Sequence, residues 1–236
     1  MISILTASYN NECYIREFIN SVLSQTYTDW ELVFIDDGST DNTKKIIDSY
    51  LDSRIHYIYK EHTNLPSSLN VGYNYCKGDY IARADADDIM FPDRLEWQFN
   101  FMESHPDVDM QANCIQVFKT NENGKIKKIG LFGNISYYPT NEDILKGTCL
   151  CHGSWIVRGS TWRRDKIYYD EDYYCGQDFE YMLNCVAHGW VLYNNMKVTM
   201  WRRIHDKCIT VNHKTDIRKR YEIAREKYKD IILNKN

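Results

Sequence analysis

The chain has 236 residues, of which 43% are hydrophobic and 26% are charged, with 11 glycines and 4 prolines. This composition excludes collagen-like, low-complexity and wholly disordered proteins. The formal net charge of −4 argues against a globally basic nucleic-acid-binding protein, so we expect no nucleic-acid partner.

The sequence carries no export or membrane signal that we recognise. No apolar run approaches the roughly 18 residues of a membrane-spanning helix. The first eight residues lack a basic segment followed by a long apolar one. We therefore expect a cytoplasmic protein whose eight cysteines are reduced thiols, since they follow no disulfide or zinc spacing.

The first half of the chain alternates short apolar runs with helical patterns. Strands are predicted at 2–6, 31–35, 54–59 and 80–84, and helices at 12–25, 41–51 and 67–76. This alternation favours βαβ units and a mostly parallel, Rossmann-like α/β sheet flanked by helices.

After about residue 106 the pattern becomes less regular. Strands of a mixed sheet are predicted at 110–118, 155–157 and 198–204, and helices near 142–146 and 179–188.

The C-terminal segment, residues 213–236, is a separate feature. From residue 214 it contains eight Lys or Arg against four Asp or Glu. Its apolar residues form a narrow seam on one face of a predicted helix: Ile217, Tyr221, Ala224, Tyr228 and Ile231. We expect this basic helix to pack on its own domain, with a homodimer contact or a peripheral contact with an anionic membrane as alternatives.

Polar residues follow three of the predicted strands, at 7–10, 36–39 and 83–88. Ligands of open parallel sheets bind beyond the carboxyl ends of the strands, so these segments indicate a binding site. No GxGxxG follows the first strand and no GxxxxGK occurs anywhere, so neither a dinucleotide fingerprint nor a P-loop is present.

Asp85, Asp87 and Asp88 lie within four residues, directly after a predicted strand. Carboxylates this close repel one another unless they are solvated, one is protonated, or a cation lies among them. Mg²⁺ and Mn²⁺ prefer oxygen ligands, so the cluster predicts a divalent-metal site. A solvated acidic turn is the alternative.

Asp36, Asp37 and Gly38 follow the second strand. A carboxylate there can accept a hydrogen bond from an N–H of a base or from a ribose hydroxyl. The alternative is a simple turn in which the glycine takes a positive φ.

Several segments together resemble family 2 glycosyltransferases, which have the GT-A fold. The segments are Ile-Leu-Thr-Ala-Ser-Tyr-Asn-Asn-Glu at 4–12, Ser-Gln-Thr-Tyr at 24–27, Val-Phe-Ile-Asp-Asp-Gly-Ser-Thr-Asp-Asn-Thr at 33–43, Gly-Asp-Tyr-Ile-Ala-Arg-Ala-Asp-Ala-Asp-Asp at 78–88 and Pro-Asp-Arg-Leu-Glu-Trp-Gln at 92–98. Their order and spacing match over residues 2–106. Residues 176–183 and 201–205 are similar to the family's Glu-Asp segment and its late Arg-x-His segment.

The resemblance implies a donor site at the strand ends. Ala7, Tyr9 and Asp37 match positions that hold the nucleotide base, with Asp37 facing a ring N–H. Glu12 matches a residue near the same pocket, and Asp85 one beside the ribose or the metal.

The resemblance also implies the remaining roles. Asp87 matches a metal ligand, His205 a residue that reaches the metal or the diphosphate, and Asp178 the catalytic base. His152 and Trp155 fall near the acceptor pocket. Asp178 begins a predicted helix, whose dipole favours an ionised carboxylate, although an aspartate there can also serve only as an N-cap.

By this resemblance we expect an inverting glycosyltransferase that moves a hexose from a nucleotide-sugar, first of all a UDP-sugar, to a hydroxyl of a glycan or other acceptor. The expected cofactor is Mn²⁺ or Mg²⁺. Residues 1–212 would form a single GT-A domain, with a nucleotide-sugar-binding half at 1–106 and an acceptor-binding half at 107–212.

Two other functions stay open from the residues alone. A nucleotidyltransferase would also use an acidic metal site, but it would need a Gly-rich triphosphate loop that is not found near the first strand. A non-catalytic nucleotide-sugar-binding module would be expected to lack the base, yet Asp178 is present.

Overall fold

The computed structural model describes residues 1–120, 126–133, 137–147 and 150–234. The strands are β1 (Ile2–Ser8), β2 (Trp30–Asp36), β3 (Ile55–Tyr59), β4 (Tyr80–Arg83), β5 (Ile89–Met90), β6 (Met110–Thr120), β7 (Ile126–Phe132), β8 (Ile156–Arg158) and β9 (Leu192–Arg203). The helices are α1 (Ile15–Leu23), α2 (Thr43–Ile47), α3 (Leu65–Tyr73), α4 (Arg94–Ser104), α5 (Asn141–Lys146), α6 (Gly159–Asp165), α7 (Gln177–Ala187), α8 (Ile209–Asn212) and α9 (Lys214–Leu233), with a short 3₁₀ turn, η1, at His152–Ser154.

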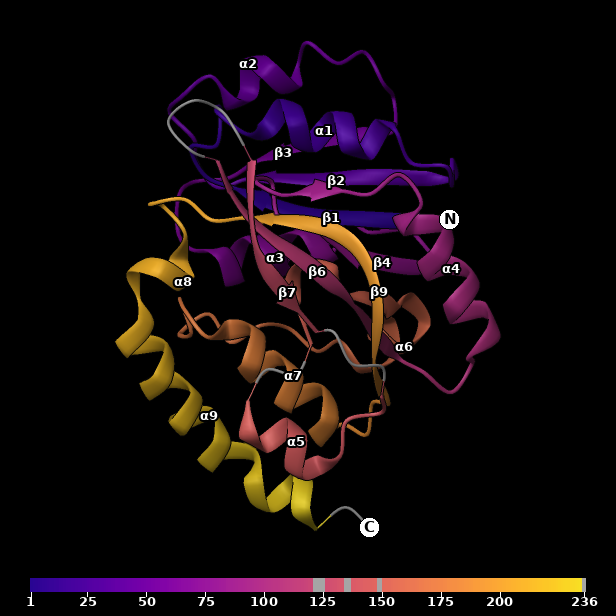
Figure 1. The fold of residues 1–236 in the computed structure, drawn as a ribbon, viewed down its shortest axis with the longest axis vertical. Helices are drawn as coiled ribbons and strands as arrows, with labels where there is room; N and C mark the ends of the chain where they lie inside the picture. Colours follow the sequence, from indigo (N-terminus) through magenta and orange to yellow (C-terminus); the bar gives the residue numbers. More distant parts are fainter. Residues whose placement is uncertain (121–125, 134–136, 148–149, 235–236) are drawn as a thin grey trace.

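One sheet runs through the described part of the chain in the order β3-β2-β1-β4-β8-β6-β9-β5, and β7 pairs with β6 (Figure 1). The strands β1 to β4 are parallel to one another. Beyond β4 the sheet is mixed, because β8 runs antiparallel to both β4 and β6 while β9 runs parallel to β6. This is the expected α/β architecture, with a regular first half and a mixed second half in one continuous sheet.

The sheet is covered on both faces, and the alternation of side chains along each strand decides which helix each residue meets. Ile2 and Ile4 of β1 join one core cluster with residues of α1, α2 and α4. Leu5 and Ala7 of the same strand join a second cluster with residues of α3, α6, α7 and α9. The loops at the carboxyl ends of the parallel strands are therefore held between two packed layers.

Three strands differ from the prediction, and one of them is the two-residue β5, which was not predicted. β9 begins at Leu192, six residues before the predicted start, and its pairing with β6 shifts register around Cys114, which breaks the simple alternation. β7 was not predicted because all seven of its residues are exposed, so its sequence shows no buried face.

The C-terminal helix α9 packs on its own domain, which was the first of the three expectations for it. It lies beside α7 and α5 (Figure 1) and buries Ala224, Tyr228 and Ile232. Ile231 was predicted for the seam but is 49% exposed, because the buried stripe continues through Ile232.

Among the described helices, none combines the length and apolarity needed to cross a bilayer. The seven cysteines within the described residues are free thiols, and Cys149 lies outside those residues.

Candidate active site

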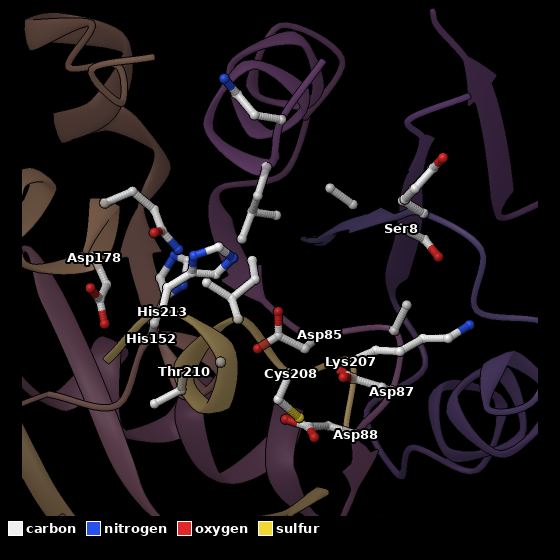
Figure 2. A pocket seen from close by; sticks show the side chains of 18 of the residues that line it. Ser8, Asp85, Asp87, Asp88, His152, Asp178, Lys207, Cys208, Thr210 and His213 are labelled. Carbon is white, nitrogen blue, oxygen red and sulfur yellow. The ribbon is translucent and has the colours of Figure 1, made fainter. Parts of the chain in front are cut away.

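A cavity of about 930 Å³ opens at the carboxyl ends of β1, β2 and β4. Its lining combines the polar strand ends with residues from η1, α7, β9 and the segment that leads into α9. In the view of Figure 2, Asp178 and His152 lie on one side, while Asp85, Asp87 and Asp88 lie on the other. The chain thus brings together carboxylates that are about 90 positions apart in the sequence.

Asp178 is the second residue of α7, and the helix N-cap is Gly176, whose φ of +73° suits a glycine. The side chain of Asp178 is therefore not the N-cap. Its Oδ1 accepts the N–H of Phe179 at 2.9 Å and lies 3.5 Å from the hydroxyl of Tyr221 on α9. Burial raises the pKa of Asp178 above its ordinary value, which brings this carboxylate closer to the basicity that a proton acceptor needs.

The acidic cluster is held in the turn between β4 and β5. The guanidinium of Arg83 donates to Asp85 Oδ1, and the backbone N–H of Arg203 donates to Asp88 Oδ1 at 2.8 Å. Burial, followed by the charges of Asp87 and Asp85, raises the pKa of Asp88 well above its ordinary value. Burial would also raise the pKa of Asp85, but the nearby charge of Arg83 turns the net shift downward.

Asp87 and His205 meet across the cavity floor. His205 Nε2 lies 2.8 Å from Asp87 Oδ2, and this hydrogen bond raises the pKa of His205 to about 9. A carboxylate and an imidazole at this separation, with the crowded carboxylates of Asp85 and Asp88 nearby, are a donor set that suits a divalent cation. The residues predicted for the metal thus fit such an ion.

Asp37 is nearly fully buried and accepts several hydrogen bonds. Its Oδ1 receives Lys60 Nζ at 2.6 Å, Ser68 Oγ at 2.8 Å and the N–H of Thr63 at 3.1 Å. Its Oδ2 lies 2.8 Å from His62 Nδ1. The contacts of Oδ1 fix the carboxylate at the cavity wall. They leave Oδ2, which lies beside His62, as the oxygen that a ligand could reach in place of His62.

The other residues predicted for the donor differ in how they are placed. Ala7, Tyr9 and Asp85 line the cavity, and Tyr9 is 44% exposed. Glu12 is not among the lining residues, because its Oε2 accepts both the backbone N–H and the amide of Asn42, at 3.0 and 2.7 Å.

Of the two residues predicted on the acceptor side, only His152 reaches the cavity. Its Nε2 lies 2.7 Å from the hydroxyl of Tyr169, and burial lowers the pKa of His152 to about 3, so the ring is neutral. Trp155 is 1% exposed and stacks in the core on Tyr181, so a direct acceptor contact by Trp155 is ruled out by its burial. It supports His152 instead, with the two rings edge to face at 4.8 Å.

Several polar or ionisable lining residues were not singled out by the sequence-based prediction, among them His62, Arg202, Lys207, Cys208 and His213. Arg202 had a usable signal, because it lies in the same matched segment as His205. The others follow no local pattern and reach the cavity only because of how the chain folds around it.

Residues 3–163 match the family model described as glycosyl transferase family 2. The chain is 37% identical to EpsE of Bacillus subtilis (strain 168), a protein named as a glycosyltransferase, over 173 residues that cover 71% of this chain and 59% of that one. For the next two relatives, from Haemophilus influenzae and Methanocaldococcus jannaschii, the matched share of their length is 62% and 66%. The chain therefore spans about three fifths of the length of these curated relatives.

Solved structures share the fold at low identity. TarS 1–349 of S. aureus, crystallised with UDP-GlcNAc, superposes with a TM-score of 0.75 at 17% identity, covering 98% of this chain and 70% of that one. The mannosyltransferase PcManGT of Pyrobaculum calidifontis, determined with GDP-Man and Mn²⁺, superposes with a TM-score of 0.70 at 15% identity, covering 95% of this chain and 62% of that one.

Proposed function

The chain belongs to glycosyl transferase family 2, and we propose that it transfers a hexose from a nucleoside diphosphate sugar to an acceptor hydroxyl, with inversion at the anomeric carbon. One observation carries the proposal. Asp178 of α7 and the cluster Asp85, Asp87 and Asp88 line the same cavity from different elements. A base and a site for the leaving group are both needed for a single displacement, and the cavity offers a candidate for each.

Asp178 is the proposed general base. An ordinary aspartate has a pKa near 3.9 and a sugar hydroxyl is far less acidic, so the carboxylate does not deprotonate the acceptor in the ground state. It accepts the proton late, as the acceptor oxygen bonds to the anomeric carbon and the hydroxyl becomes acidic. The N–H of Phe179 holds Oδ1, which orients the carboxylate for this step.

Asp87 and His205 are the proposed ligands of a divalent cation, Mn²⁺ or Mg²⁺. When bound, such an ion neutralises the charge that develops on the leaving diphosphate. Arg202 also lines the cavity and adds a permanent positive charge to the same region. The neutral ring of His152 is available to contact the acceptor.

The proposed donor is a UDP-hexose. Tyr9 offers an exposed ring on which a base can stack, and Asp37 Oδ2 can accept the N3–H of uracil, whereas the unprotonated N3 of cytosine would be repelled. TarS binds UDP-GlcNAc, which agrees with this donor class. The guanine N1–H could satisfy the same acceptor, and PcManGT was determined with GDP-Man, so a GDP-sugar is the second choice.

The test is release of nucleoside diphosphate from a panel of UDP-hexoses and GDP-mannose, with glycan acceptors and with Mn²⁺, Mg²⁺ or EDTA. We expect metal-dependent release of UDP that exceeds release of GDP and is lost in Asp87→Ala. Release of pyrophosphate from a nucleoside triphosphate and a sugar phosphate, without transfer from any nucleotide-sugar, would instead identify a nucleotidyltransferase.

A further inference from the structure

Cys208 occupies a defined position at the edge of the acidic cluster. It follows β9 and is the N-cap residue of α8, three positions after His205. Its Sγ accepts the backbone N–H of His205 at 3.3 Å and lies 3.6 Å from the carbonyl oxygen of Arg203. Two backbone contacts therefore hold the sulfur, and Cys208 is one of the residues that line the cavity (Figure 2).

Cys208, Asp87 and His205 bring three kinds of donor atom together. Their sulfur, carboxylate oxygen and imidazole nitrogen all lie within 4.8 Å of one another. Two protein ligands of one zinc-like ion, each about 2.0–2.3 Å from it, are separated by at most about 4.6 Å. Small side-chain rotations would thus allow all three atoms to contact one cation.

We propose that Cys208 is a third protein ligand of the cation bound by Asp87 and His205, and that its sulfur makes the site favour thiophilic ions such as Cd²⁺, Zn²⁺ and Co²⁺ over Mg²⁺. The inference rests on the metal site of the proposed function. On binding, the thiol of Cys208 and the protonated ring of His205 each release a proton to solvent, and the thiolate and the neutral imidazole bond to the ion; no electron is transferred.

The preference follows from ligand softness. Thiolate sulfur binds soft and borderline ions more strongly than it binds Mg²⁺, which prefers carboxylate, carbonyl and water oxygens. With Asp87 and His205 alone, the site would offer one oxygen and one nitrogen. With Cys208 it offers a sulfur, a nitrogen and an oxygen, which are the three ligand types that zinc takes, and three protein ligands leave a fourth position open for substrate.

The experiment titrates the reduced full chain with Cd²⁺ and with Co²⁺ and records thiolate-to-metal charge-transfer absorption in the ultraviolet. Three variants are compared with the wild type: Cys208→Ser, Asp87→Ala and Cys13→Ser. Cys13 is the matched control, because it is exposed and is not part of the cluster. Thermal shifts with Mg²⁺ and Mn²⁺ are measured on the same proteins.

We expect the wild type and Cys13→Ser to develop the charge-transfer band at one equivalent of Cd²⁺, and Cys208→Ser to lose it. Cd²⁺ affinity should fall by at least about tenfold in Cys208→Ser, because even the loss of a residue that only hydrogen-bonds to a metal ligand weakens metal binding by about this factor. Mg²⁺ affinity should change little. Asp87→Ala should weaken the same band, because the two residues share one ion.

A band that survives in Cys208→Ser, or one that Asp87→Ala leaves unchanged, would overturn the inference. If Mn²⁺ still stabilises Cys208→Ser as it does the wild type and no cysteine band is found in any protein, the metal site of the proposed function stands and only the role of Cys208 is refuted. If no cation stabilises the wild type, the metal site itself is wrong.

Discussion

The imidazole of His62 lies flat on the phenol ring of Tyr9, with ring centroids 3.9 Å apart and an interplanar angle of 16°. Nδ1 of the same imidazole lies 3.0 Å from the backbone carbonyl oxygen of Asp37, with which it forms a hydrogen bond, and 2.8 Å from Asp37 Oδ2. The stacking on Tyr9 and the place beside Asp37 Oδ2 are the two positions that the proposed function gives to uracil. A base that takes both positions on this face of Tyr9 must therefore displace His62.

The first prediction is that His62→Ala binds UDP more tightly than the wild type. The apparent dissociation constant increases as the fraction of molecules with a free site falls, so removing the competing ring should improve affinity by roughly threefold to tenfold. Calorimetric titration with UDP in the presence of Mn²⁺ measures this. His56→Ala is the matched control, because His56 lies on β3 and contacts Glu31 instead of Asp37. Weaker binding by His62→Ala would mean that His62 supports the base.

The second prediction concerns turnover by Asp178→Asn. Asparagine keeps an oxygen for the N–H of Phe179 but cannot accept the acceptor's proton, so sugar transfer should fall by roughly 10²-fold or more. The affinity for UDP and Mn²⁺ should stay within a factor of about two, because Asp178 is on α7 and the proposed donor contacts are elsewhere. Transfer at close to the wild-type rate would place the base on another residue.

The third prediction is that Asp178→Asn raises the melting temperature at neutral pH. Burial raises the pKa of Asp178 above its ordinary value of 3.8, so the folded state binds the proton more tightly than the unfolded state. That contribution to stability is complete below the ordinary pKa and is lost as the pH increases through the raised pKa. The melting temperature of the variant should therefore exceed that of the wild type most at about pH 7.5, and the difference in melting temperature should become smaller toward about pH 4. Melting curves across this range test it, and a gap that grows on acidification would contradict it.

The fourth prediction uses Gly153 of η1. A Cβ added at Gly153 would lie 2.9 Å from Asp85 Oδ2, so Gly153→Ala must move that carboxylate. We expect several-fold weaker binding of UDP with Mn²⁺ and little change in melting temperature, because the clash falls on the end of a side chain. Gly130→Ala is the control, since a Cβ there meets nothing within 4 Å. Unchanged binding in Gly153→Ala would show that the position of Asp85 is unimportant for the donor.

The fifth prediction concerns α9. Glu180 of α7 is completely buried, and its Oε1 accepts from the hydroxyl of Tyr228 at 2.7 Å and from Lys227 Nζ at 3.1 Å. Tyr228→Phe removes one of these two donors from a buried carboxylate. The free energy of unfolding, measured by urea denaturation, should therefore fall by about 1–3 kcal/mol. Tyr59→Phe, at an exposed tyrosine, should change stability very little. Equal stability of the two variants would contradict the role given to Tyr228.

The polar strand ends that form the proposed donor side of the cavity could be predicted from the sequence because they follow apolar strands of a regular βαβ pattern. Asp37 comes directly after β2 and Asp85 comes two residues after the end of β4, and parallel strands place their carboxyl ends at one edge. The position of Asp178 at the start of a helix could also be predicted, because Gly176 marks where that helix begins. That it is not the N-cap depends on a backbone angle that the sequence pattern does not determine.

The rest of the cavity depends on long-range packing. His152 and Trp155 are three positions apart, yet only the fold decides that the first faces the cavity and the second faces the core. Cys208 reaches Asp87 only because β9 returns beside β6 and pairs with β5. The sequence pattern presents residues 213–236 as a separate feature, yet Ile217 and Tyr221 of α9 line the cavity, which only the fold of the whole chain determines.

The participation of α9 in the cavity has a consequence for biosynthesis. The parallel strands β1, β2 and β4 are all complete by Arg83, so a growing chain can assemble the nucleotide side of the sheet while more than half of the sequence is still to be made. The wall that includes His205, Cys208 and Tyr221 is synthesised after the other walls of the cavity. A nascent chain that has reached only β9 would therefore expose Asp178 without its helical cover, and the ability to bind ligand should appear abruptly, once α9 has been made.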